Sequence, residues 1–246
     1  MASRHFKHKH PLFRKSSSQT GTSYTQSPYY FWWEFVRRHE GYRITCLNNG
    51  RGEFSHLYKD FGDVHSPSFR EWWSYQDRGA KLFAEPSKPI GLGFIDPKNL
   101  AEITPYIETG SVGLLTIPMT MDKKSIIIRF ERLIRKIHPR QRGQRYIMDS
   151  HARYPIVAQY TVFSLKKILE AYDLKYGGAN LKLWEIGQKL RLGDTLTKDE
   201  LHYERGKLTP TIKNKQNQLS VAASKKIKLA QSIISGVGQG VFPSYK

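Results

Sequence analysis

The positive charge of this 246-residue chain is confined almost entirely to three blocks of the sequence. Residues 1–28 hold five Lys and Arg and no acid, residues 121–145 hold nine against two acids, and residues 205–246 hold eight and no acid. The three blocks carry a net charge of +20, against +19 for the whole chain, so the remainder is close to neutral. Segregated charge presents cationic surfaces to an anionic partner. Nucleic acid is the expected partner, with double-stranded DNA preferred and RNA as the alternative.

Length and cysteine usage bound the class of protein. The chain is long enough for one large domain or two small ones. Cys46 is the only cysteine, so no intrachain disulfide can form, which fits a reducing compartment. No apolar run reaches the roughly 20 residues that span a bilayer, and no hydrophobic stretch follows the N-terminal basic residues. We therefore expect a cytoplasmic protein that does not bind membranes.

Turn residues and helical periodicity divide the chain into four predicted segments. The predicted fold class is α+β, mostly α. The segments are a disordered basic tail (1–28), an aromatic helical module (29–85), a small α/β unit with a basic helix (86–145) and a helix-turn-helix-like helical domain (146–246).

Within the aromatic module, ring spacing predicts helices over residues 30–39 and 53–61, separated by a break at Gly41-Tyr42. Ser68 is expected to N-cap a third helix. Rings at this spacing form a core, and stacking of unpaired bases is the other use for them. Paired tryptophans are hard to bury in so small a module, which adds a protein-protein surface as a further alternative. A homodimer or another protein partner would bind through this module.

In the α/β unit, short apolar strands are expected at Leu92–Ile95 and Val112–Ile117, bounded by Gly or Pro. Asp122 is expected to cap a helix that Pro139 ends, with apolar side chains along one face and a cationic stripe opposite. The planar fork of arginine matches phosphate oxygens, so the cations of this helix and the following link are predicted to bind phosphate. They are Arg129, Arg132, Arg135, Lys136, Arg140, Arg142 and Arg145.

The C-terminal segment contains the parts of a helix-turn-helix domain, and the last helix is expected to carry the cations that contact DNA. The expected helices span about 164–175, 183–190 and 219–235, with a polar loop over 194–218. Lysine contacts phosphate as a point charge, and Gln231 can read a base edge. Two features oppose this interpretation: the gap before the last helix exceeds the tight turn of the motif, and a lysine-rich face is often only solvated. The predicted contacts are Lys213, Lys215, Lys225, Lys226, Lys228 and Gln231.

Catalysis has little support in the sequence. Asp60, Asp63 and His65 would ligate a metal ion if a loop brought them together, which would make the chain a metal-dependent nuclease. One acidic cluster is weaker than the paired clusters of a two-metal site, and the sequence has no Walker loop or dinucleotide fingerprint. We therefore expect a protein that is not an enzyme and uses no metal or other cofactor.

Several stretches carry a resemblance to known proteins. They are Trp33–Arg43, Phe69–Trp73, Leu82–Pro86, Leu183–Gly187 and Gly240–Pro243. In these stretches the chain resembles poorly characterised bacterial proteins of mobile elements, some of them transcriptional regulators. The shared patterns concern aromatic packing rather than chemically reactive groups. The resemblance implies a DNA-binding, regulator-like role on a plasmid, prophage or integrative element.

The expected function is therefore non-enzymatic nucleic-acid binding, by a DNA-binding regulator of transcription or a maintenance factor of a bacterial mobile element. The alternative is a structural or assembly protein of a phage or defence complex that binds RNA or an acidic protein partner.

Overall fold

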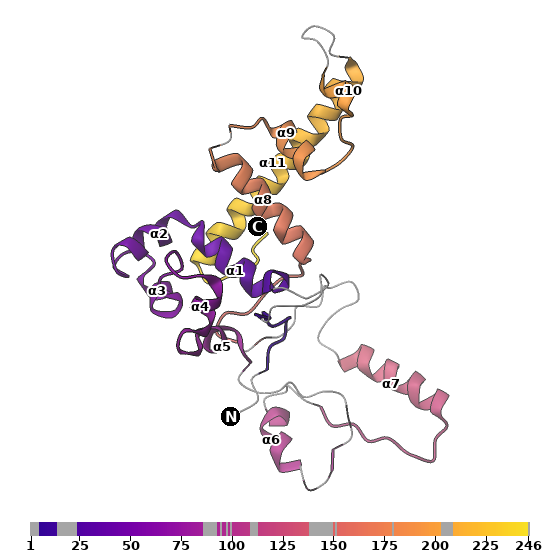
Figure 1. Ribbon diagram of the computed structural model, residues 1–246. Helices are drawn as coiled ribbons and strands as arrows, with labels where there is room; N and C mark the ends of the chain where they lie inside the picture. Colours follow the sequence, from indigo (N-terminus) through magenta and orange to yellow (C-terminus); the bar gives the residue numbers. More distant parts are fainter. Residues whose placement is uncertain are drawn as a thin grey trace. The chain divides into compact units, whose positions relative to one another are not determined.

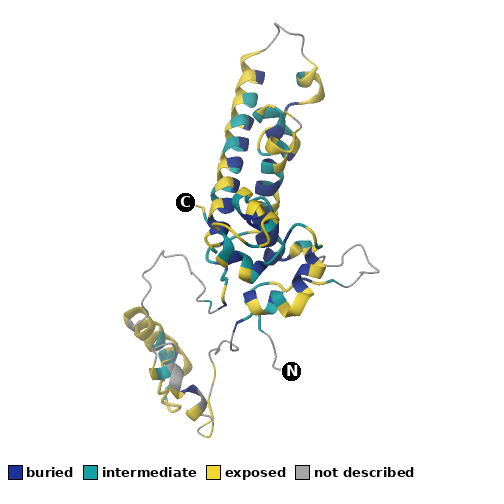
Figure 2. Ribbon diagram, turned by 90° about the vertical axis from the view of Figure 1, so that its left-hand side faces the viewer, coloured by how far each residue is buried: buried dark blue, intermediate teal, exposed yellow. Residues whose placement is uncertain are grey.

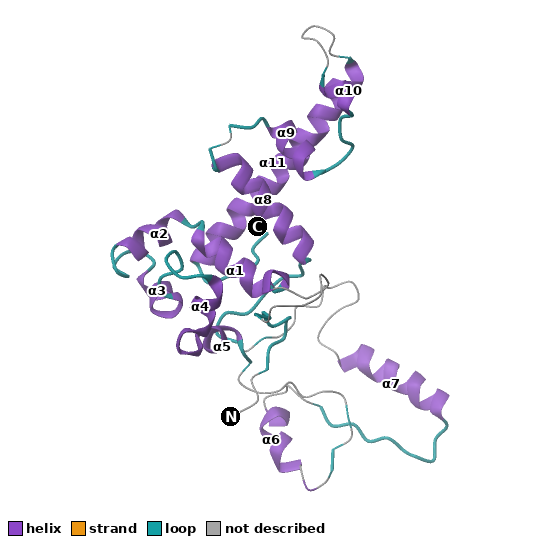
Figure 3. Ribbon diagram, viewed as in Figure 1, coloured by secondary structure: helices purple, strands orange, loops and turns teal. Residues whose placement is uncertain are grey.

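The computed structural model of the chain contains helices and no strand in the residues that it describes (Figures 1 and 3). Those residues are 5–13, 24–85, 93, 95–96, 98, 100–108, 113–137, 150, 152–178, 180–202 and 209–245. Two isolated bridges within these ranges pair His5 with Glu85 and Ile156 with Phe242. The expectation of a mostly helical chain is confirmed, whereas the expected α+β class is wrong.

The expected strand–helix unit lacks its strand because that strand would have no partner. Residues 113–118 have no regular secondary structure, and Leu114 and Leu115 are exposed. A strand is stable only where a neighbour takes up its backbone N–H and C=O groups, and the described residues contain no second strand. Of the other expected strand, 92–95, only residues 93 and 95 are described, and neither is in a strand.

The helices fall into two compact units, residues 1–87 with 147–246, and residues 88–146. The first unit contains η1 (Tyr24–Gln26), α1 (Pro28–Arg37), α2 (Glu40–Leu47), α3 (Ser55–Phe61), α4 (Phe69–Ser74), η2 (Tyr75–Asp77), α5 (Arg78–Phe83), α8 (Val162–Tyr176), α9 (Leu183–Leu190), α10 (Lys198–Leu201) and α11 (Pro210–Gly238). The second unit contains α6 (Leu100–Glu108) and α7 (Lys123–Ile137). The expected aromatic module and the C-terminal helices therefore belong to one unit.

Capping side chains set the starts of α2 and α4 in the aromatic module. Ser68 and Glu71 form a capping box at α4, with the Glu71 N–H donating to Ser68 Oγ at 3.3 Å and the Ser68 N–H donating to Glu71 Oε2 at 2.8 Å. The expected cap at Ser68 is thus confirmed. The expected break at Gly41-Tyr42 is wrong, because His39 Nδ1 accepts from the Tyr42 N–H at 3.1 Å and starts α2 just before it.

The rings of the aromatic module form a core, as their spacing predicts. Trp32, Phe35, Tyr42, Phe61 and Trp72 are completely buried. The Trp72 indole N–H donates to the Phe61 carbonyl at 2.6 Å, and the Tyr42 hydroxyl donates to the Gly62 carbonyl at 2.6 Å. These two bonds join the end of α3 to α4 and α2, and they satisfy polar atoms that the core would otherwise leave unpaired.

Residues 5–13, which the sequence places in a disordered tail, lie against this core. The Glu85 N–H donates to the His5 carbonyl at 2.7 Å, and the ring of Phe6 lies 5.9 Å from that of Trp73. The Tyr160 hydroxyl lies 2.9 Å from His8 Nδ1. Composition alone does not predict this packing, because the apolar side chains of the segment contact helices that lie far from it in the sequence.

The C-terminal helices pack around α11, which at 29 residues is about 44 Å long. The residues of α11 that face its neighbours are buried along its length (Figure 2). Its middle packs with α8 and α9, and its last turns enter the aromatic core through Ile233 and Val237. The expected loop over 194–218 is wrong in two places, because it contains α10 (Lys198–Leu201) and because α11 begins at Pro210 with Thr209 as its N-cap.

We predict that Gly187→Ala destabilises the first unit. A Cβ atom at Gly187 would lie 2.6 Å from the Leu219 carbonyl oxygen, so α9 and α11 would have to move apart. We expect a loss of about 1–3 kcal/mol from overpacking, which exceeds the gain of about 0.5–1 kcal/mol in helix propensity. Urea unfolding measures the difference. Gly193→Ala is the control, since a Cβ there meets nothing within 4 Å. Equal stability of both variants would contradict the close approach of the two helices.

We also predict that stability falls below neutral pH through His39. Its ring lies 4.5 Å from that of Phe54, and burial lowers its pKa from the ordinary value. Because the folded-state pKa is the lower one, the unfolded chain takes up the proton first. The contribution of neutral His39 is complete above about pH 6.5 and is lost as the pH falls through the folded-state pKa.

His39→Asn keeps a capping oxygen for α2 and removes the titrating group. Plots of unfolding free energy against pH, from about 7.5 to 5, should be flatter for this variant than for the wild type. Some slope should persist, because burial also lowers the pKa values of His8, His10 and His65. Identical slopes for the two proteins would show that His39 does not contribute.

Candidate nucleic-acid interface

Helix α7 displays the cations that the sequence predicts as phosphate contacts. Asp122 caps it as expected, accepting from the Ser125 N–H at 3.0 Å. Arg129, Arg132, Arg135 and Lys136 are all exposed. Among the described residues only Arg135 has an ion pair, to Glu131 at 3.7 Å, and both side chains are largely solvated. Such an exposed pair contributes little, so the cations of α7 stay available to a ligand. Arg140, Arg142 and Arg145 lie outside the described residues.

The apolar side chains of α7 are also exposed. Ile127 and Ile128 are 47% and 48% exposed, and Leu133 and Ile134 are 38% and 36% exposed. The helix is therefore amphipathic as the sequence predicts, but within the described residues its apolar face is only partly covered.

The predicted contacts on α11 divide into two sets. Lys213, Lys225 and Lys228 are exposed, and Lys226 is partly buried. The Lys215 ammonium instead lies 3.0 Å from Glu200 Oε1 and 3.6 Å from Asp194 Oδ2. Gln231 Nε2 donates to the Tyr176 hydroxyl at 2.8 Å. Lys215 and Gln231 thus hold neighbouring segments of the first unit together, and the sequence could not reveal these partners.

The described C-terminal helices differ from a helix-turn-helix motif in one respect that matters. The interval between α9 and α11 runs over residues 191–209 and contains α10, whereas the motif uses a tight turn. The last turns of α11 lie in the core, with Gly236, Val237 and Gly238 buried. The exposed lysines of α11, Lys213, Lys225 and Lys228, all precede these turns, so only the earlier part of the helix offers exposed cations to DNA.

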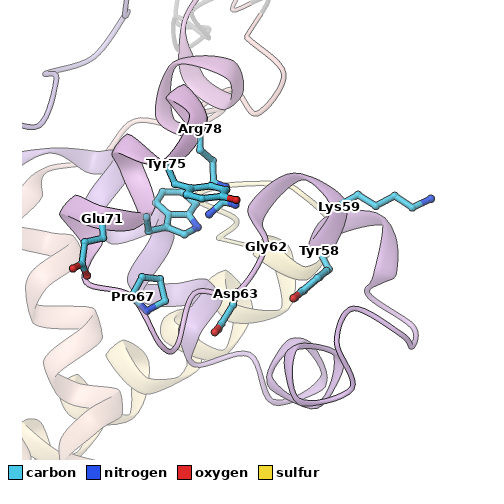
Figure 4. A pocket seen from close by; sticks show the side chains of 9 residues that line it. Tyr58, Lys59, Gly62, Asp63, Pro67, Glu71, Tyr75 and Arg78 are labelled. Atoms are coloured by element: carbon cyan, nitrogen blue, oxygen red, sulfur yellow. The ribbon is translucent and has the colours of Figure 1, made fainter.

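A hollow that the sequence does not predict lies between α3, α4 and α5 (Figure 4). Its volume is about 570 Å³. The lining residues are Tyr58, Lys59, Gly62, Asp63, Pro67, Glu71, Trp72, Tyr75 and Arg78. Three of the nine lining residues are aromatic, and the two cations balance the two carboxylates. We call this the aromatic hollow.

Arg78 stands in the aromatic hollow with its guanidinium stacked on rings rather than paired with an acid. The guanidinium carbon lies 4.9 Å from the ring centroid of Tyr75 and 5.9 Å from that of Trp72 (Figure 4). Burial lowers the pKa of Arg78, an effect that the nearby tyrosines and Asp63 oppose only in part. No carboxylate of the described residues forms an ion pair with it.

A smaller hollow of about 150 Å³ adjoins the first and shares Lys59, Tyr75 and Arg78 with it. We call it the cationic hollow. Its charged lining consists of Lys59, Arg78, Lys81 and Arg153 against the single carboxylate of Asp60. That carboxylate is already engaged, by Arg153 at 2.8 Å and by the Tyr154 hydroxyl at 2.6 Å. The cationic hollow therefore has an excess of positive charge.

The acids of this region have structural roles. Burial raises the pKa of Asp63, but hydrogen bonds from the Ser66 side chain and from the His65 N–H, which donates to Asp63 Oδ1 at 2.8 Å, lower it below the ordinary value. Glu71 belongs to the capping box of α4. No group of three His, Cys, Asp or Glu side chains in the described ranges could hold a metal ion. The nuclease hypothesis for Asp60, Asp63 and His65 therefore gains no support.

A strained corner joins α4 to α5 beside both hollows. Gln76 and Asp77 have φ values of 47° and 60°, the left-handed region that non-glycine residues rarely adopt. Tyr75 and Arg78 flank these two residues directly. Strain of this kind is concentrated at functional sites, where a ligand needs side chains in fixed positions.

The chain matches no known protein-family model, no curated protein and no solved structure. Within the described residues no helix has the length and apolar character to cross a membrane.

We predict that Gln76→Gly stabilises the protein by about 1 kcal/mol, because glycine adopts the left-handed conformation without the steric cost. Urea unfolding measures the change. Gln218→Gly, at an exposed position with helical backbone in α11, should instead destabilise by about 1 kcal/mol. A loss of similar size at both positions would mean that the corner is not strained.

Proposed function

We propose that the chain is a non-enzymatic nucleic-acid-binding protein, acting in the cytoplasm as a DNA-binding regulator or maintenance factor of a bacterial mobile element. The resemblance of its aromatic stretches to such proteins agrees with this role. A regulator that binds symmetric half-sites would act as a homodimer.

The observation that supports this proposal best is the free cationic stripe of α7. Arg129, Arg132 and Lys136 recur at spacings of three and four, which places them along one side of the helix. The helix carries six Lys or Arg and one Glu in 15 residues, and its cations are exposed. Solubility needs no such concentration, whereas a polyphosphate presents regularly spaced anions that match it. Lys225 and Lys228 on α11 offer a second exposed pair.

The alternative is a structural or assembly protein that binds RNA or an acidic protein. The same stripe would attract those partners, but the dependence of binding on salt separates them. Affinity for duplex DNA falls steeply with salt because condensed counterions are released, with a slope close to the number of phosphates contacted.

We predict that reversing the charge at Arg129, Arg132 and Lys136 to Glu weakens binding to duplex DNA. The slope of log affinity against log salt should become less steep by about 3, since each phosphate contact contributes about 0.9. Fluorescence anisotropy over a salt series, with duplex DNA, single-stranded DNA and RNA of mixed sequence, gives both quantities.

The control is the triple variant in which Arg51, Lys175 and Lys189 become Glu. These side chains are exposed, lie outside the three charged blocks, and give the same change in net charge. The control should keep most of the wild-type slope. An equal loss in both triple variants would show a general effect of net charge and would contradict a binding surface on α7.

A further inference from the structure

The aromatic and cationic hollows differ in charge but have three lining residues in common, Lys59, Tyr75 and Arg78. The aromatic hollow is electrically balanced and lined by the rings of Tyr58 and Tyr75 beside the completely buried Trp72. The cationic hollow has four cations and one acid, Asp60, which is paired with Arg153. A ligand that fills the pair therefore has a flat apolar part joined at short distance to an anionic part.

We propose that the two hollows bind one nucleoside monophosphate unit, with its base in the aromatic hollow and its phosphate in the cationic hollow. This inference deepens the proposed function and rests on it where the unit belongs to a nucleic-acid strand. A free nucleotide has the same chemistry, and the experiment below separates the two sources.

The aromatic hollow suits a base in size and in surface. Its volume of about 570 Å³ lies within the range of small-molecule sites. Tyr75 is 56% exposed, so a ring face remains open to a stacking partner. Bases stack on tyrosine and on the planar guanidinium of arginine without regard to their sequence.

The cationic hollow suits a phosphate because three of its four cations, Lys59, Arg78 and Lys81, have no carboxylate partner in the described residues, whereas Arg153 is paired with Asp60. The guanidinium of Arg78 has five N–H donors, and its described contacts are with ring faces rather than with acceptors. Lys59 and Lys81 are exposed and form no ion pair in the described residues. An arginine that is partly buried beside rings, with no carboxylate, gains more from an anion than a solvated arginine does.

A cationic ligand is the other chemistry that aromatic walls attract, and it does not fit here. Aromatic cages bind ammonium groups through open ring faces. In the aromatic hollow the guanidinium of Arg78 already lies over Tyr75 and would repel a second cation. The position of Arg78 therefore selects an anion.

The geometry also favours an unpaired nucleotide over a base pair. A base enters such a hollow only when its faces and edges are free of a duplex stack. The α7 stripe requires no unpaired base. Single strands should therefore use both surfaces, and duplex DNA only the cationic stripe.

Titration calorimetry with adenosine monophosphate, adenosine and inorganic phosphate tests the hollow directly, and the trinucleotide of three adenylates tests the strand form. Tyr75→Ala removes the stacking ring, and Arg78→Lys keeps the charge but removes the planar fork. Each should weaken binding of the monophosphate or the trinucleotide tenfold or more, as expected from the loss of one stacking partner. Arg70→Lys is the control, because Arg70 is exposed on α4 and lines neither hollow.

Tight binding of the monophosphate supports a free nucleotide, and binding of the trinucleotide alone supports a strand. The inference is overturned if the wild type binds neither, if inorganic phosphate binds as tightly as the monophosphate, or if Tyr75→Ala binds as the wild type does. Tyr75 is largely exposed, so its variant should fold even if Arg78→Lys does not, and thermal unfolding checks both.

The same variants separate this inference from the proposed function. Duplex DNA binding and its salt slope should be unchanged in Tyr75→Ala, whereas the triple Glu variant of α7 should retain nucleotide binding. If the wild type binds duplex DNA but neither the monophosphate nor the trinucleotide, the inference about the hollows fails while the proposed function stands.

Discussion

The arrangement of the first unit depends on the packing of the buried Trp32 ring. Its ring lies within 6.3 Å, between centroids, of four others: Phe61, Phe83, Tyr154 and Phe242. These rings come from α3, from α5, from the segment before α8 and from the C-terminal segment after α11. Each buried ring removes about 150–250 Å² from water, so the cluster holds together parts of the chain that are far apart in the sequence. It also fixes α3 and α5, which form walls of both hollows.

Local signals predict local structure well in this chain, and long-range structure poorly. Ser68 and Asp122 can be recognised as caps because their partners lie three residues away. The place of Phe242 in the core cannot be read in this way, since its partners lie in helices near the other end of the chain. The apolar run at Val112–Ile117 has the composition of a strand, but a strand depends on a neighbour that the sequence does not specify.

The same limit applies to the candidate site. The sequence locates the charged blocks but not which cations are paired. Lys215 is held by Glu200, which lies 15 residues earlier in the chain. The sequence does not predict Arg78 as a site residue, because nothing in its local composition marks it. It stands outside every charged block, next to Asp77 in a stretch of balanced charge. Only the fold brings it between the rings of Trp72 and Tyr75 and beside Lys59 and Lys81.

The cationic stripe of α7 and the cationic hollow differ in their effect on the stability of the folded protein. The side chains of α7 are solvated, so their charge costs little and attracts any polyanion through a force that salt screens. Arg78 is partly removed from water, has no acid partner in the described residues, and is held beside two residues of strained backbone. Partial burial of an arginine without an acid partner, beside strained backbone, lowers the stability of the folded protein, and a bound anion would offset that loss. Under the proposed function, phosphate contacts at α7 supply affinity and position. Under the further inference, a base in the aromatic hollow adds discrimination between paired and unpaired strands.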